Sequence, residues 1–152
     1  MFASCAATAT HQFAEPARDW QTRTGQLLYR NPKMTVIGDV VVRFSKKGDF
    51  ELTFSKGPGV TLLNLRQDAN FAEVKGPMAS RAWSGPIEHV PQRLLGWIEL
   101  CDYLLYSFSM EQFIGGTPPP PIEHVTGDRI PGQDRLPRSR QVPGAERFVF
   151  RF

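Results

Sequence analysis

The stretch TVIGDVVVRFSKKGDFELTFSKGPGVTLLNLRQD, residues 35–68, decides the fold. Apolar side chains recur at every second position of its first two segments, at Val40, Val42, Phe44, Phe50, Leu52 and Phe54. The positions between them are mostly polar, Arg43, Glu51 and Thr53 among them. A period of two is typical of β-strands with one buried and one solvated face. The stretch therefore predicts three consecutive antiparallel strands, the third of which follows Gly59.

Lys46-Lys47-Gly48 separates the first two segments and predicts a tight hairpin. The apolar faces of the two strands coincide in one register, which pairs Phe44 with Phe50, Val42 with Leu52 and Val40 with Phe54. This register requires a three-residue loop with Gly48 in the left-handed conformation that glycine adopts readily. A slip by one residue would turn one apolar face outward. We therefore predict this register and a positive φ at Gly48.

Composition limits the class of protein. A chain of 152 residues is long enough for one domain with a substantial core, and a hydrophobic content of 41% is too high for a disordered chain. The net charge of +3 is small and the basic residues are spread along the chain, so we expect no nucleic-acid partner. The 13 glycines and 13 prolines predict many turns and argue against an all-helical fold.

Further strands are predicted on either side of the central stretch. Residues 20–30 form a first strand, which ends at Asn31-Pro32 because proline cannot donate to a ladder. Residues 71–75 form another, and the alternating phenylalanines of residues 146–152 predict a closing strand.

In the strand at residues 60–66, the pattern leaves open which side chains face the core. Val60 and Leu62 form one candidate pair, and Leu63 and Leu65 form the other.

Residues 91–108 carry the helical pattern of the chain. Apolar residues recur there at helical spacing, at Leu94, Trp97, Ile98, Cys101, Leu104, Leu105 and Phe108. Pro91 suits a first helical turn, and Glu99 and Asp102 argue against a transmembrane span. We expect an amphipathic helix that lies on the sheet, with Cys101 packed as a small hydrophobe rather than acting as a nucleophile.

Two segments lie outside the predicted sheet and helix. Residues 1–19 are small and polar, and predict the end of a lipoprotein signal followed by a flexible tether. Residues 109–145 are rich in proline, glycine and charge, and predict an irregular segment. We therefore expect a single α+β domain over residues 20–152, a mainly antiparallel curved sheet covered by an amphipathic helix.

Cys5 is a candidate lipidation site. The sequence Phe-Ala-Ser-Cys resembles a lipobox, in which cleavage before the cysteine leaves it as the acylated first residue. No charged segment or apolar run precedes it, so this interpretation requires that the natural start lies upstream of Met1. The alternative is a chance cysteine in a frayed N-terminus.

Taken in order, RTGQLLYR, VVRFSKKGDFELTFSKGPGVTLLNLRQD, FAEVKGP and LLGWIELCDYLL follow the possible lipobox. This order resembles the LolA/LolB-like lipoprotein-localisation family over residues 20–105 and the last strand. The resemblance implies an incomplete antiparallel barrel that helices close, with an apolar hollow that takes lipoprotein acyl chains. It also implies an outer-membrane lipoprotein of the bacterial cell envelope that faces the periplasm.

The predicted function is binding of acyl chains of lipid or lipoproteins in a hollow between sheet and helix, lined by Val40, Val42, Phe44, Phe50, Leu52, Phe54, Trp97 and Leu104. The membrane is a further partner, through a lipid anchor at Cys5. The alternative is that these residues pack solidly, and that the protein is a structural or protein-interaction lipoprotein domain without a ligand.

We expect no enzyme, metal or cofactor, because the chain carries no nucleophile elbow or phosphate-binding motif. Its two acid–histidine pairs are Glu88-His89 and Glu123-His124. Neighbours in an extended segment point to opposite faces, so neither pair binds a metal by itself. Both pairs together would form a site only if folding brought them close.

Overall fold

The computed structural model describes residues 11–111, 122–125 and 146–152. Within them, eight antiparallel strands form one sheet in the order β6-β5-β4-β3-β2-β1-β8-β7. The strands are β1 (Gln21–Arg30), β2 (Thr35–Phe44), β3 (Phe50–Ser55), β4 (Thr61–Gln67), β5 (Phe71–Lys75), β6 (Trp83–Pro86), β7 (Ile122–Val125) and β8 (Arg147–Arg151). The helices are η1 (Pro77–Ala79), η2 (Ile87–His89) and α1 (Gln92–Glu111).

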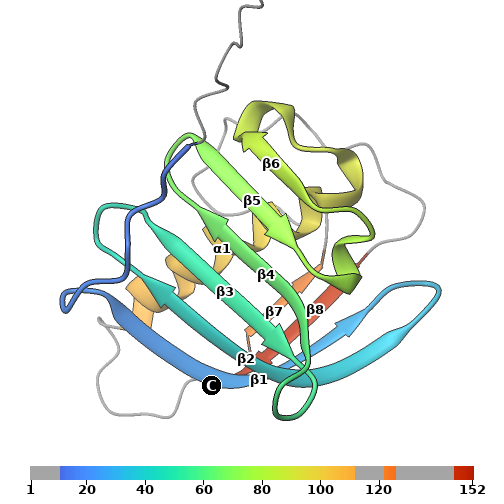
Figure 1. Ribbon diagram of the computed structural model, residues 1–152. Coiled ribbons are helices and arrows are strands. Elements are labelled where there is room, and N and C mark those ends of the chain that lie inside the picture. Colours follow the sequence, from blue (N-terminus) through green and yellow to red (C-terminus); the bar gives the residue numbers. More distant parts are fainter. Residues whose placement is uncertain (1–10, 112–121, 126–145) are drawn as a thin grey trace, which may run out of the picture.

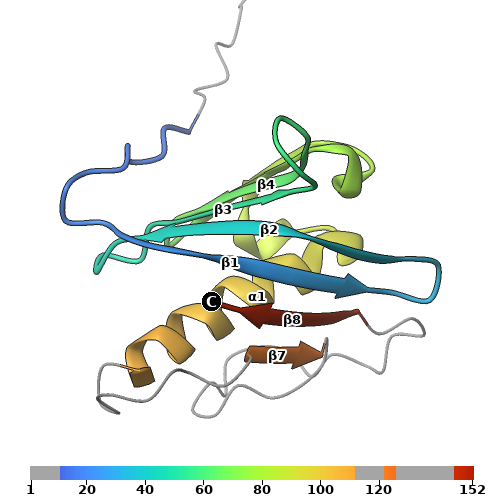
Figure 2. The same cartoon turned by 90° about the horizontal axis from the view of Figure 1, so that it is seen from below.

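The sheet is curved, and α1 lies on its concave side (Figure 1). In the view from below, the strands from β4 to β7 curl around the helix (Figure 2). The two edge strands, β6 and β7, do not pair with each other, so the sheet is not closed. The predicted fold class, α+β with one curved antiparallel sheet and a covering helix, is confirmed.

The β2–β3 hairpin has the predicted register. Phe44 pairs with Phe50, Val42 with Leu52 and Val40 with Phe54, and φ of Gly48 is 97°. The Ser45 hydroxyl organises the loop, because its oxygen accepts the N–H groups of Lys47 and Asp49 at 3.1 and 3.2 Å. It also donates to the Asp49 carboxylate at 2.8 Å. Local hydrogen bonds thus reinforce a register that the apolar pattern requires.

In β4, Leu63 and Leu65 face the core, and this settles the orientation that the sequence left open. The pairing with β3 shifts between Phe54 and Ser55. Phe54 pairs with Leu63 and Ser55 pairs with Thr61, so Leu62 forms a bulge without a pairing partner in β3. The backbone at Gly76 packs closely against this bulge. A Cβ on Gly76 would lie 2.6 Å from the Leu62 carbonyl oxygen.

Two strands lie where the sequence predicted none. β6 falls in the segment expected to be a plain connection, and β7 falls within residues 109–145, expected to be irregular. Each has four residues, too few for an alternating pattern to be recognised. Both form because the edge of a neighbouring strand, β5 or β8, offers unpaired backbone groups.

The core lies between the concave face of the sheet and α1. Its buried apolar side chains form one cluster: Leu27, Tyr29, Val40, Val42, Phe44, Phe50, Leu52, Phe54, Leu63, Leu65, Ala72, Val74, Ala79, Leu94, Trp97, Ile98, Leu100, Cys101, Leu104, Phe108, Phe148 and Phe150. The helix contributes nearly a third of this set, including six of the seven residues expected from the apolar spacing of residues 91–108. Leu105 is only partly buried, and Leu100, which the spacing did not single out, is fully buried.

Candidate functional site

The structure brings all eight predicted lining residues together on the concave side of the sheet. Each is at most 8% exposed, and all belong to the single core cluster. The six strand residues come from β2 and β3, where the alternation points them inward, and the other two come from α1. The prediction of a shared apolar surface therefore agrees with their positions.

Aromatic rings of α1 occupy the concave face. The Trp97 ring centroid lies 4.9 Å from that of Phe148, 5.1 Å from that of Tyr29 and 6.3 Å from that of Phe54. These distances are typical of rings in direct packing contact. Trp97 is therefore the central side chain between the helix and three strands of the sheet.

A second aromatic contact holds the C-terminal half of α1. The ring of Phe108 stacks on that of Phe44 at 5.0 Å, and the Phe152 ring meets it edge-on at 5.2 Å. The helix is thus packed against the sheet near both of its ends by large side chains.

Sequence reasoning missed several members of this surface. Phe148 and Phe150 of β8, and Leu27 and Tyr29 of β1, are buried with the predicted eight. The alternation in residues 146–152 showed that these phenylalanines lie on one face. It did not show that β8 pairs with β1, which is a long-range contact. Only that pairing places Phe148 opposite Tyr29 and against Trp97.

A polar cluster lies beside the aromatic core, where β8 begins. The Tyr29 hydroxyl accepts a hydrogen bond from Asn31 Nδ2 at 3.2 Å and donates one to the Glu146 carboxylate. Burial, and then the negative charge of Glu146, raise the pKa of Tyr29 to about 12. Burial also raises the pKa of Glu146, helped by the charge of Glu99 and opposed by the Tyr29 hydrogen bond.

Two carboxyl groups on α1 belong to the same electrostatic cluster. Burial raises the pKa of Asp102, and burial together with the charge of Asp102 raises that of Glu99. Carboxyl groups with raised pKa values occur at catalytic sites, where they act as general acids, and also in structural networks. Here they lie on a helix whose other side is apolar. Ionisation of these two carboxyl groups therefore makes the packed position of the helix less favourable.

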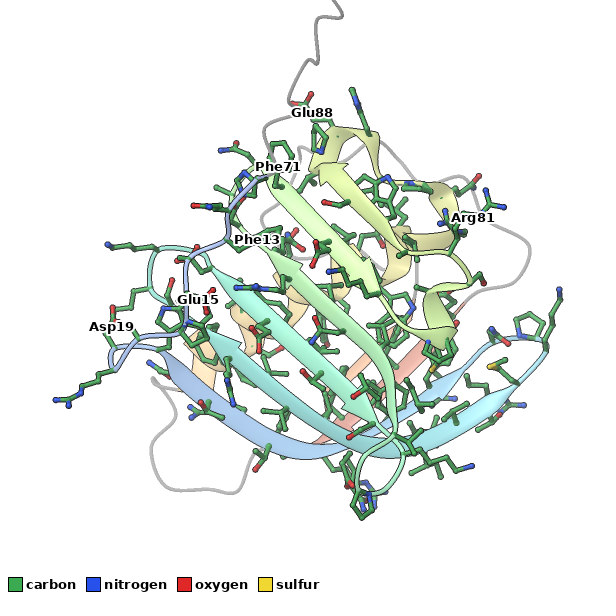
Figure 3. All side chains as sticks on the ribbon, viewed as in Figure 1. Phe13, Glu15, Asp19, Phe71, Arg81 and Glu88 are labelled. Atoms are coloured by element: carbon green, nitrogen blue, oxygen red, sulfur yellow. The ribbon has the colours of Figure 1, made fainter. Side chains whose placement is uncertain are left out.

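The N-terminal part of the described chain crosses the outer, convex face of the sheet. The His11 ring stacks on Phe71 with centroids 4.1 Å apart, and its Nε2 lies 2.5 Å from Asp68 Oδ2. Figure 3 looks onto this face and shows Phe13 close to the start of β5, with Glu15 further along the segment.

Arg66 of β4 holds the same segment. Its guanidinium lies 5.3 Å from the centre of the Phe13 ring and donates to the Ala14 carbonyl oxygen at 3.3 Å. It also lies 3.7 Å from the Glu51 carboxylate of β3. Residues 11–15, which the sequence assigned to a tether, therefore have specific contacts with β4, with β5 and with Asp68 between them.

Cys101 is fully buried in the core, and burial raises the pKa of its thiol well above the ordinary value. Its Sγ lies 3.6 Å from the Trp97 carbonyl oxygen. A buried thiol with a raised pKa is a poor nucleophile, which agrees with the expected packing role. Cys5, the predicted lipidation site, lies outside the described residues.

The two acid–histidine pairs lie at opposite ends of the strand order. Glu88 and His89 are in η2, directly after edge strand β6, whereas Glu123 and His124 are in β7 at the other edge. Among the described residues, no group of three or more His, Cys, Asp or Glu side chains is arranged to hold a metal ion. Over the same residues, no helix has both the length and the apolar character to span a membrane.

No protein-family model, curated protein or solved structure matches the chain. The resemblance to the LolA/LolB-like family therefore stays a prediction.

Proposed function

We propose that this chain is a non-catalytic domain of a bacterial envelope lipoprotein, and that it acts as a structural or protein-interaction module. In this proposal an acylated Cys5 anchors it, and the domain faces the periplasm. Its core serves stability, and its contacts with other molecules are made by the outer surface.

The filled concave face carries this proposal. The eight side chains expected to line a hollow are at most 8% exposed, and Trp97, Leu104 and Phe108 of α1 pack against the sheet where an acyl chain would lie. An acyl chain would enter only by displacing these side chains. Burying one CH₂ group of the ligand gains roughly 0.8 kcal/mol, and the apolar contacts of α1 that are lost offset this gain.

Binding of an acyl chain is the second candidate function, and the unclosed sheet favours it. A single helix, α1, covers the concave face of the described sheet. Glu99 and Asp102 of this helix have pKa values raised by burial, so they weaken its packing when ionised. A displaced α1 would leave the apolar hollow of an incomplete barrel, as the LolA/LolB-like resemblance implies.

Titration of the full chain with a fluorescent fatty acid distinguishes the two functions. Cys5→Ser prevents acylation, and the packed-core proposal predicts no saturable increase in fluorescence. Saturable binding that oleate competes away would support the carrier instead, provided that Leu104→Ala changes the affinity. Tyr106→Ala is the matched control, because Tyr106 lies on the same helix and is 40% exposed.

A further inference from the structure

The N-terminal segment meets the sheet far from the strand that follows it. Gln21 at the start of β1 and Gln67 at the end of β4 stand in one row, through partners in β2 and β3. Asp68, which His11 contacts, directly follows Gln67. Strands lie about 4.8 Å apart, so the chain crosses roughly 14 Å of sheet between His11 and β1. Figure 1 shows this segment, in dark blue, running from the start of β5 to the start of β1.

The β4–β5 turn holds Asp68 ready to bind His11. Asp68 Oδ1 accepts the N–H groups of Asn70 and Phe71 at 2.9 and 2.8 Å. The other oxygen, Oδ2, lies 2.5 Å from His11 Nε2. Because the turn already fixes the carboxylate, Asp68 loses little side-chain freedom when His11 binds.

Residues 11–15 attach to the sheet by one side. His11 and Phe13 are partly buried, whereas Gln12 and Ala14 are exposed. The His11 ring stacks on Phe71, and the Phe13 ring meets His11 edge-on with centroids 4.8 Å apart. The segment is therefore an extended strap, residues 11–15, with two aromatic side chains against the domain.

Arg66 is the second holding point of the strap. The Glu51 carboxylate of β3 lies 3.7 Å from the Arg66 guanidinium, which contacts the Phe13 ring and the Ala14 carbonyl oxygen. Glu15 also lies 3.9 Å from Arg66 but is 87% exposed, so this ion pair adds little. The strap belongs to no strand and is held by side chains, so its release breaks no pairing of the sheet.

We propose that the strap sets how far the domain stands from its membrane anchor. This inference rests on the proposed acylation of Cys5, which lies six positions before His11 and sixteen before Gln21. A chain spans at most about 3.3–3.6 Å per residue, so the docked strap keeps His11 within roughly 20 Å of the anchor. After release, the start of β1 could stand up to roughly 55 Å away. Docking therefore holds the β4–β5 turn close to the membrane.

A nitroxide on Cys5 of the full, non-acylated chain tests the docking. Cys101 is fully buried, so a thiol-reactive label is directed to Cys5. We expect the label to weaken the amide NMR signals of Asn70 and Phe71 at least twofold relative to the reduced label. Unweakened signals in the parent chain would overturn the proposal.

Asp68→Asn combined with Phe13→Ala is the released variant. The asparagine keeps an oxygen for the two N–H groups of the turn but replaces the oxygen that meets His11. This variant should regain at least half of the lost signal. Gln12→Ala is the matched control, because Gln12 is exposed on the same strap, and it should behave like the parent chain. Circular dichroism should show that both variants fold, and equal weakening in parent and released variant would overturn the proposal.

Coupling Cys5 to a maleimide lipid in vesicles tests the effect on distance, since it supplies an anchor without acylation. Energy transfer from the tryptophans to dansyl headgroups should fall at least twofold in the released variant and stay unchanged in Gln12→Ala. Equal transfer in parent and released variant would overturn the proposal. Metabolic labelling with a fatty acid tests the acylation of Cys5 separately, so failure of the anchor is distinguishable from failure of the strap.

Discussion

The two halves of the convex face are built alike and covered differently. On β4 and β5, residues 11–15 contact the strands, with His11 stacked on Phe71 and Phe13 against Arg66. On β8, β1 and β2, Ile37 remains exposed beside Leu28, and no described segment crosses it. Outward apolar residues on the first half are explained by the chain itself. On the second half, an exposed side chain such as Ile37 needs no partner, because single apolar residues are common on protein surfaces.

The concave face makes the contrast sharper, since its side chains are buried beneath α1, with Ala79 of η1 also in the core. A side chain there should contribute several times more to stability than one on the convex face. The covered half of the convex face should be intermediate. The following substitutions measure this order directly.

The largest effect is expected in the concave face, at Trp97. Trp97→Ala removes a side chain that is 2% exposed and contacts three aromatic rings. The loss of burial and the cavity left behind should lower the free energy of unfolding by about 3–5 kcal/mol. Ile37→Ser, at an exposed position of β2 on the convex face, should change the free energy of unfolding by about 0.5 kcal/mol or less. Urea denaturation of both variants checks this, and similar losses would contradict the expected difference between the buried and the exposed face.

An intermediate loss of stability is expected at His11, which lies on the convex face where residues 11–15 contact β4 and β5. His11→Ala removes a ring stack on Phe71 and the contact with Asp68, and should cost about 1 kcal/mol. Burial alone would raise the pKa of Asp68, but the N–H groups of Asn70 and Phe71, and His11, lower it below its ordinary value. Thermal denaturation measures the cost. Unchanged stability would mean that residues 11–15 do not hold to the sheet in solution.

A small effect of the opposite sign, a gain in stability, is expected from Asp102→Asn. The pKa of Asp102 is raised in the folded chain, so the unfolded chain ionises first as the pH rises. Stability is lost from the ordinary value of 3.8 up to the raised folded value, and the penalty then stays constant. The substitution should therefore stabilise by about 0.5 kcal/mol at pH 7 and not at pH 3. An equal effect at both pH values would refute the electrostatic cause.

Much of the central sheet could be predicted from the sequence, because period-two alternation and the chemistry of Gly48 are local signals. The β2–β3 register follows from them, and so does the inward direction of the six lining residues in β2 and β3. The core orientation of β4 could not be predicted, since a bulge at Leu62 changes the pairing with β3.

Features that depend on long-range pairing were out of reach. The β1–β8 pairing joins distant parts of the chain, and it creates both the Tyr29–Trp97–Phe148 contact and the Leu28–Val149 pair. Neither segment shows this in its own pattern. The docking of His11 on Phe71 was missed for the same reason, because residues 11–15 have no periodicity of their own.

The central claim is that α1 fills the concave face permanently. Native-state hydrogen exchange of the α1 amides, with and without fatty acid, tests it most directly. The account predicts that the amides near Trp97 and Leu104 exchange only through global unfolding, and that fatty acid leaves their rates unchanged. Exchange through a local opening of α1 far below the global free energy, together with altered rates when fatty acid is added, would contradict it.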